Sequence, residues 1–95
     1  MGTNEAIDFG APRDMVGEED HVELVAKHGD QPIRCRISRE ALEELASMAD
    51  ATATERLRVA QAHFDDLTDK WGYLISVGRF EPDGSVLLRT NDVRT

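Results

Sequence analysis

The chain has a single cysteine among its 95 residues, Cys35. One cysteine cannot form a disulfide within the chain, so the fold does not rely on oxidation. The first residues, MGTNEAIDFG, lack the basic and apolar regions of a signal peptide, and Ala6 stands where a myristoylation signal needs Ser or Thr. No apolar run approaches the roughly 18 residues of a membrane span. These absences predict a cytoplasmic protein.

Basic residues are also few, with 11 Lys and Arg against 19 Asp and Glu, a net charge of −8 and a pI of about 4.7. Nucleic-acid binding needs a footprint of Lys and Arg, and an anionic membrane repels an acidic protein, so we expect neither partner. Residues 1–30 hold eight of the acids and two of the bases. We therefore predict one domain over residues 1–95, in which residues 1–20 are partly an acidic loop that leads into the fold.

Catalytic and metal-binding motifs are absent as well. The sequence has no nucleophile elbow, no phosphate-binding glycine loop and no zinc spacing. His63 and Asp66 share a helix face but lack a third ligand, and Asp65 and Asp69 are a like-charge pair on the solvent side. We expect no metal, no cofactor and no enzymatic activity.

Several segments are typical of β-strands. AIDF (6–9) is a short candidate strand, and a loop rich in Gly and acids follows it over residues 10–20. HVELVAK (21–27) and IRCRI (33–37) alternate between apolar and polar residues, and the short Gly-containing turn between them predicts an antiparallel hairpin. SVLLRT (85–90) is expected to be the last strand.

Two helices are expected between the hairpin and the last strand. Ser38 is placed to cap a helix over residues 39–49, with Glu40 in its first turn. Thr52 and Glu55 match a capping box for a second helix. The second helix has one apolar stripe: Leu57, Ala60, Phe64, Leu67, Trp71 and Leu74. We favour a helix that runs to about Val77, although residues 73–80 also fit a strand.

The expected fold is therefore α+β. A small antiparallel sheet consists of the short N-terminal strand, the hairpin and the C-terminal strand, and the two helices pack on one face of it. An unbroken helix over residues 53–77 would be about 37 Å long, which is more than one small domain needs. Part of it is then available for a second subunit, and a homodimer is our hypothesis.

The order of several short motifs resembles one protein family. CRIS followed by REAL, then HFDDL, and then PDGSVLL with Asp92 close behind are similar to the small bacterial family known as domain of unknown function 1488. The resemblance extends from about Ala6 to Val93. It implies a compact α+β domain whose antiparallel sheet is covered on one face by helices. It implies no activity, cofactor or catalytic residue.

Cys35 has two interpretations. Arg34 and Arg36 on either side of it suggest an activated thiol, and a cysteine enzyme is one hypothesis. Strand alternation, however, directs both arginines away from the sulfur and places Cys35 with Ile33 and Ile37. We therefore predict that Cys35 packs in the core.

We infer a non-enzymatic protein-interaction module with an accessory or regulatory role, because the chain is small and acidic and lacks a catalytic constellation. The candidate interaction surface comprises Arg34, Arg36, Glu23, Val25 and Trp71, although Trp71 also fits the core. The alternative is a domain that binds a small molecule or a metal in a pocket between the sheet and the helices.

Overall fold

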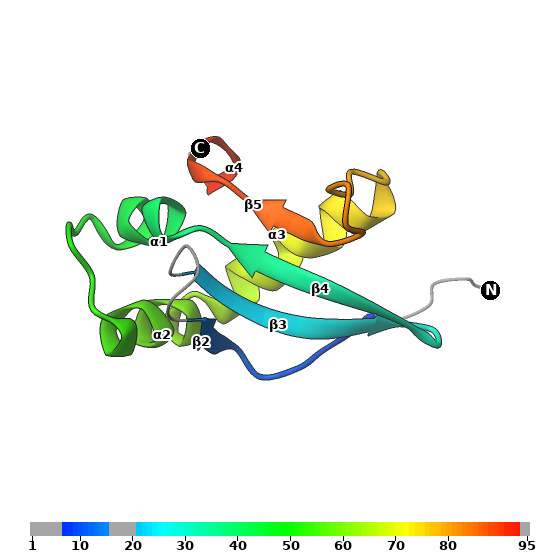
Figure 1. Ribbon diagram of the computed structural model, residues 1–95, viewed down its shortest axis with the longest axis horizontal. Helices are drawn as coiled ribbons and strands as arrows, with labels where there is room; N and C mark the ends of the chain where they lie inside the picture. The colour runs from blue at the N-terminus through cyan, green and yellow to red at the C-terminus, as the bar shows by residue number, and fades with distance from the viewer. Residues whose placement is uncertain (1–6, 16–20, 94–95) are drawn as a thin grey trace.

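The computed structural model describes residues 7–15 and 21–93, and it is an α+β fold as the sequence predicts (Figure 1). The chain order is β1 (Ile7–Phe9), β2 (Arg13–Met15), β3 (His21–His28), β4 (Gln31–Ile37), α1 (Arg39–Ala46), α2 (Ala53–Ala62), α3 (Phe64–Ser76), β5 (Val86–Leu88) and α4 (Thr90–Val93). Residues 1–6 and 16–20 of the expected acidic lead-in lie outside the described residues.

The expected hairpin forms the centre of the sheet. β3 and β4 are antiparallel, with Leu24 opposite Cys35, and β1 is antiparallel to β3 on the other side. β5 pairs with β4 in parallel, so the prediction of an entirely antiparallel sheet was wrong at the last strand. Helices α1 to α3 carry the chain from the end of β4 back along the sheet, and a strand that follows such a crossover runs in the same direction as the first one (Figure 1).

The segment predicted as a loop over residues 10–20 contains the short strand β2. Phe9 pairs with Ala26 and Arg13 with Glu23, so three residues of this edge lie opposite two of β3. This extra residue makes a bulge. The N–H of Gly10 donates to the carbonyl of Val25 at 3.0 Å, and a Cβ on Gly10 would lie 3.0 Å from that oxygen. Glycine is suited to this close approach of two backbones.

The first helix begins where the sequence predicts. The backbone N–H of Ala41 donates to Ser38 Oγ at 3.1 Å, which confirms Ser38 as the N-cap. The helix ends at Ala46 because Ser47 adopts the left-handed conformation, with φ of 54°. The predicted helix over residues 39–49 was therefore too long, and Met48, beyond its end, is exposed.

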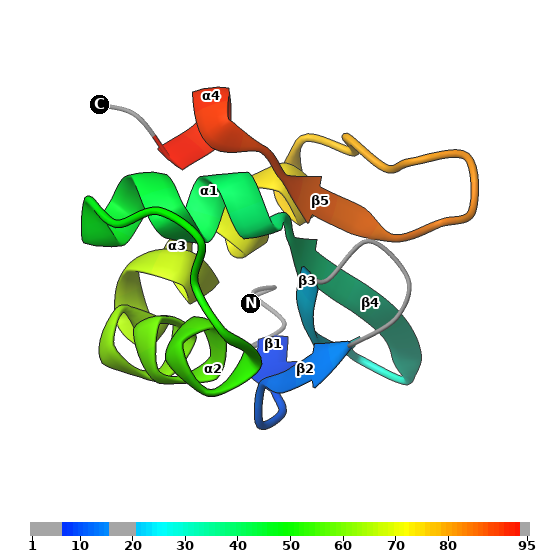
Figure 2. The ribbon, with the colours of Figure 1, turned by 60° about the vertical axis from the view of Figure 1, so that its left-hand side comes forward.

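The second predicted helix is two helices, α2 and α3. The Thr52–Glu55 capping box is present, and α3 ends at Ser76, close to the predicted Val77. His63 interrupts the helix, with φ of −107° and ψ of 22°. Helix α2 contacts β2 and β3, and α3 contacts β5, so the break allows each helix to follow a different part of the sheet (Figure 2).

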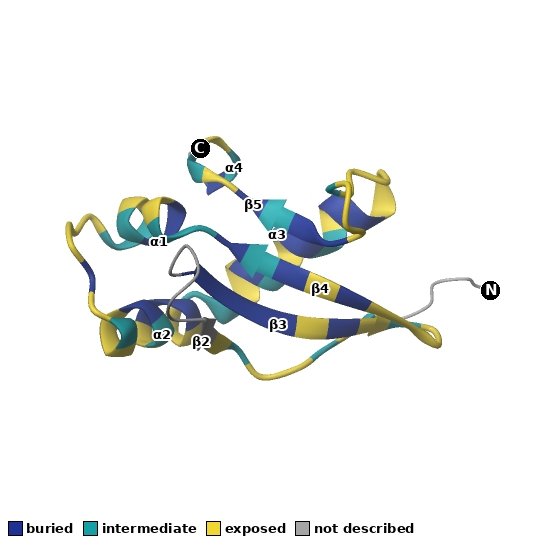
Figure 3. Ribbon diagram, in the orientation of Figure 1, coloured by how far each residue is buried: buried dark blue, intermediate teal, exposed yellow. Residues whose placement is uncertain are grey.

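The hydrophobic core lies between one sheet face and α2 and α3, and α1 and α4 contribute residues at one end of the sheet (Figure 3). The strand residues that face it are Val22, Leu24, Ala26, Ile33, Cys35, Ile37, Val86 and Leu88. Trp71 of α3 is fully buried against them, and its Nε1 donates to the carbonyl oxygen of Arg36 at 2.9 Å. This bond fixes α3 to the middle of the sheet.

Candidate functional site

The sheet has a second face, here called the outer face, which is turned away from α2 and α3. Because side chains alternate along a strand, Glu23 and Val25 of β3 and Arg34 and Arg36 of β4 belong to it. Glu23 is the register partner of Arg36, and Val25 is the partner of Arg34. Val25 is 43% exposed. Four of the five residues predicted as an interaction surface therefore lie side by side.

Glu23 is buried on this face, at 6% exposure. Its Oε1 accepts a hydrogen bond from Arg34 Nη2 at 3.2 Å and its Oε2 one from Arg34 Nε at 3.4 Å. His21 Nε2 lies 3.2 Å from Glu23 Oε1. Burial raises the pKa of Glu23, but the hydrogen bonds from Arg34 and His21 outweigh burial and hold that pKa below its usual value.

Asp83 reaches the same face from the turn that precedes β5. Its Oδ2 lies 3.6 Å from Arg34 Nη1 and 3.5 Å from Arg36 Nη1. Its Oδ1 accepts hydrogen bonds from Ser85 Oγ at 2.7 Å and from the Ser85 N–H at 2.9 Å, and these bonds lower the pKa of Asp83. Arg36 Nη1 also donates to Ser85 Oγ at 3.2 Å.

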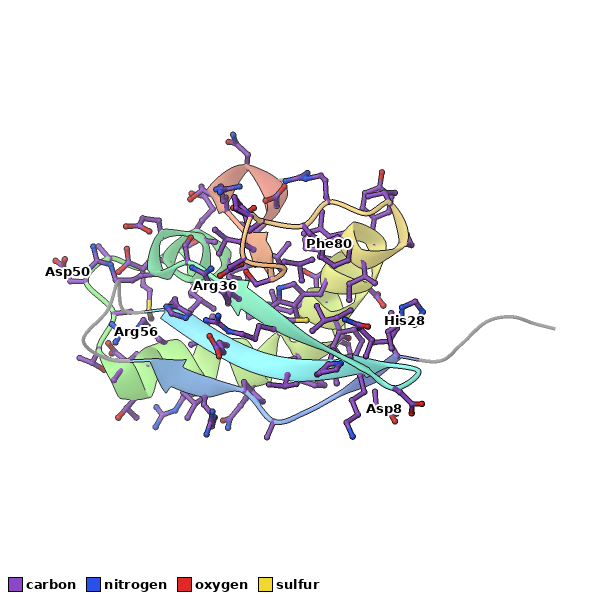
Figure 4. The ribbon with its side chains drawn as sticks, turned by 45° about the vertical axis from the view of Figure 1, so that its right-hand side comes forward. Asp8, His28, Arg36, Asp50, Arg56 and Phe80 are labelled. Carbon is purple, nitrogen blue, oxygen red and sulfur yellow. The ribbon has the colours of Figure 1, made fainter. Side chains whose placement is uncertain are left out.

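Together these residues form what we call the ionic network: His21, Glu23, Arg34, Arg36, Asp83 and Ser85. Figure 4 shows Arg36 near the end of β4 that leads into α1. The side chain of Arg34 is 50% exposed and that of Arg36 is 17% exposed. The network can therefore offer guanidinium donors to a partner while its Glu23 end stays buried.

Sequence reasoning missed the contribution of His21, Asp83 and Ser85 to this site. His21 has a local signal, because it lies two residues before Glu23 on the same strand face. The spacing of Asp83 and Ser85 in PDGS is typical of a turn in which an Asp oxygen accepts the N–H two residues later. Nothing local to that turn indicates that it lies over β4, because its position depends on the parallel pairing of β5.

Trp71 does not belong to the interaction surface. It lies on the opposite side of the sheet and is fully buried. Its inclusion was wrong because the apolar stripe of the helix that carries it is covered by the sheet. The other interpretation of Trp71, as a core residue, is confirmed.

Cys35 is confirmed as a core residue. Its side chain is fully buried, and its Sγ donates to the carbonyl of Ile33 at 3.8 Å. Burial raises the pKa of the thiol to about 12. A nucleophilic cysteine must be ionised to the thiolate and must be accessible to a substrate. The thiol of Cys35 is neither ionised nor accessible in the folded protein.

The other candidate residues from the sequence do not come together into one site. Asp66 pairs with Lys70 at 3.1 Å on α3, and Asp65 and Asp69 are exposed. Among residues 7–15 and 21–93, no three His, Cys, Asp or Glu side chains gather in a way that could hold a metal ion. Within the same ranges, no helix has the length and hydrophobicity to cross a membrane.

A cleft of about 390 Å³ lies where α3 meets β5 and α4. Leu74 and Leu88 provide apolar lining, and Tyr73, which is 65% exposed, stands beside them. The polar lining of the cleft consists of Asp69, Lys70, Arg79, Asn91 and Asp92. The Arg79 Nη2 to Asp92 Oδ1 distance is 3.5 Å. This cleft is at the edge of the sheet, whereas the expected ligand pocket lay between the sheet and the helices.

The homodimer hypothesis loses one of its supports, the single long helix over residues 53–77, because His63 divides that segment into two helices that both contact the sheet. Its other support, an apolar Val25 on the outer face, is an exposed side chain. Self-association itself stays a prediction.

Comparison with known proteins identifies relatives of unknown function. The model of the family described as "Protein of unknown function (DUF1488)" matches residues 7–88. The crystal structure of a protein of unknown function from this family, from Shewanella loihica PV-4, superposes with a TM-score of 0.82 at 22% sequence identity. The match covers 92% of this chain and 96% of that chain, and it shows a shared fold. Curated proteins give no match.

Cys35 should react with a thiol reagent such as Ellman's reagent only after the protein unfolds, because the native thiol is both buried and protonated. The rate of labelling is measured in native buffer and in denaturant. Ser76→Cys, at an exposed position of α3, gives a control thiol that should react at once in the native protein. Native labelling of Cys35 at the rate of the control would contradict the buried site.

Ionised Glu23 should stabilise the fold. Because its folded pKa lies below the ordinary value of 4.5, the contribution is complete above about pH 4.5 and is lost as the pH falls through the folded pKa. The difference in Tm between the wild type and Glu23→Gln should therefore be largest near neutral pH and shrink below about pH 4.5. Thermal unfolding over a pH series measures it. The exposed control Asp69→Asn should differ little from the wild type, and a Glu23→Gln deficit independent of pH would refute this role.

Proposed function

The chain belongs to the DUF1488 family, and we propose that it is a non-enzymatic protein-interaction module with an accessory or regulatory role. In this proposal it acts in the cytoplasm and binds its partner through the outer face of the sheet. The observation that carries the proposal is an exposed apolar residue, Val25, beside the half-exposed guanidinium of Arg34.

This combination suits a protein partner. Arginine is enriched in protein interfaces, where the core of the contact patch is also more apolar than the surface around it. Arg34 is already held by Glu23 through two hydrogen bonds, so it has less side-chain freedom to lose on binding. An anchored guanidinium next to an apolar contact is a preorganised patch.

The charge of the outer face also differs from that of the whole chain. Its described cations are Arg13, Lys27, Arg34 and Arg36, and its described carboxylates are Asp8, Glu23 and Asp83. Among the described residues of the outer face, these four cations and three carboxylates give a balance of +1, although the chain carries −8 overall. The outer face can therefore contact a partner whose binding segment is neutral or acidic. The net charge supports the expectation that nucleic acids and anionic membranes are not partners.

Val25→Asp tests the proposal, with Val77→Asp as the matched control. Both valines are about half exposed, and Val77 follows α3, away from the outer face. Tagged wild type and variants capture proteins from the native host, and each captured protein is then purified and its Kd measured. Val25→Asp should weaken the binding of a specific partner by about tenfold or more in Kd, and Val77→Asp should leave that binding intact.

Circular dichroism and Tm must first show that both variants are folded. If every captured protein binds Val25→Asp and Val77→Asp equally, the outer face is not the interface. If the folded wild type captures no protein that binds it when purified, the interaction module itself is refuted.

A small-molecule function is the second candidate, because the cleft between α3, β5 and α4 combines an apolar floor with an exposed Tyr73 ring. Its volume is within the range of ligand pockets, about 300–1,000 Å³. A ligand at 100 times its Kd should raise the Tm by on the order of 10 °C. Tyr73→Ala should abolish this shift, and Val77→Ala, outside the lining, should keep it. A thermal-shift screen in which no compound gives a Tyr73-dependent shift would dismiss this candidate.

A further inference from the structure

Two arginines of one strand converge on a single carboxylate oxygen. Arg34 and Arg36 are two residues apart on β4, so their side chains leave the same face. The Nη1 atoms of both lie 3.5–3.6 Å from Asp83 Oδ2. Guanidinium groups match carboxylates in shape and charge. The space between these two groups thus already accepts a carboxylate.

Asp83 occupies this space loosely. A charge-assisted N–H···O bond is usually about 2.7–2.9 Å long, and both distances to the arginines are longer than that. The short bonds of Asp83 are made instead by its other oxygen, to Ser85. The Asp83 side chain is 48% exposed. A second carboxylate that bonds directly to the two guanidinium groups can therefore compete with it.

The arginines would keep their positions after Asp83 Oδ2 is displaced, because Ser85 stays bonded to Oδ1. Arg34 is held by two hydrogen bonds to the buried carboxylate of Glu23, and Arg36 by a hydrogen bond to the hydroxyl of the buried Ser85. Neither anchor uses Asp83 as its acceptor. The pair is consequently preorganised for an incoming acceptor, which lowers the entropy lost on binding.

We infer that Arg34 and Arg36 form a binding site for an Asp or Glu carboxylate on an acidic segment of a partner protein, and that Asp83 fills this site from within the chain until the partner displaces it. This inference rests on the proposed function, because it names the chemical group that the outer face receives. Val25, the register partner of Arg34, provides the adjacent apolar contact.

A carboxylate fits better than a phosphate group. Glu23 already takes the Nε and Nη2 donors of Arg34. Fewer donors therefore remain for the three oxygens of a phosphate group, whereas a carboxylate has only two oxygens to bond. Asp83 also shows that a carboxylate has the right size for the space between the two guanidinium groups.

The test is an NMR titration of ¹⁵N-labelled protein with an acetylated tetraglutamate peptide, and separately with inorganic phosphate. The peptide should shift the side-chain Nε–H signals of Arg34 and Arg36. Asp83→Asn should bind the peptide about fivefold more tightly, because it removes the competing charge but keeps an oxygen for Ser85. Arg34→Gln should lose the binding, and Arg58→Gln, an exposed arginine of α2, should keep it.

Asp8→Asn is the matched control for charge. Asp8 is exposed on the outer face at the opposite end of β3, and this variant removes the same charge without touching the arginine pair (Figure 4). The Kd of Asp8→Asn for the peptide should differ from that of the wild type by less than twofold. If Asp8→Asn strengthens binding as much as Asp83→Asn does, the effect is general electrostatics and the displacement is refuted. Tighter binding of phosphate than of the peptide would overturn the ligand class.

The titration tests the arginine site and the capture experiment tests the proposed function, so each can be refuted without the other. If the peptide binds neither the wild type nor Asp83→Asn, the arginine site is refuted, and Val25-dependent capture of a partner would still support the proposed function. Specific peptide binding by a chain that captures no protein able to bind it when purified would leave the carboxylate site standing and refute the interaction module. A folded Arg34→Lys variant keeps the positive charge but loses the paired N–H donors of the guanidinium group. It should bind the peptide more weakly than the wild type.

Discussion

The alternation of side chains along β4 is the constraint on which both the core and the outer face of the sheet depend. Ile33, Cys35 and Ile37 enter the core, and the arginines between them enter the outer face. The two faces are joined through the backbone of Arg36, whose carbonyl accepts the indole N–H of Trp71 while its side chain bonds to Ser85. A shift of β4 by one residue would bury two guanidinium groups and expose the apolar set, so its register is strongly specified.

The polar side of this arrangement has an energetic cost that a plain sheet would avoid. Removing the charge of Glu23 from water is unfavourable, and the hydrogen bonds from Arg34 and His21 outweigh this cost and hold the pKa of Glu23 below its usual value. Cross-strand pairs of threonine or valine would stabilise an exposed sheet face without any buried charge. The ionic network is therefore not the most stable way to cover this face, as the proposed role of the outer face in binding would lead us to expect.

Local patterns predicted the parts of the fold that local forces determine. The hairpin follows from two alternating runs around a turn, and the helix starts at Ser38 and Thr52 follow from side chains that satisfy free N–H groups nearby. The parallel pairing of β5, the break at His63 and the short strand β2 depend on contacts between distant segments. The candidate site divides in the same way: Glu23, Arg34 and Arg36 were predicted from alternation, whereas Asp83 reaches them only because β5 lies beside β4.

The position of Asp83 connects this fold to its proposed function. The turn over residues 81–85 is held by its own hydrogen bonds, from Glu81 N–H to the Ser85 carbonyl and from Ser85 to Asp83. Only the Asp83 oxygen that makes no short bond within the turn points at the arginines. Releasing that oxygen from the arginine pair therefore breaks neither the turn nor the pairing of β5 with β4. A partner carboxylate competes with a weak surface ion pair rather than with the stability of the fold, and such pairs contribute about 0–1 kcal/mol.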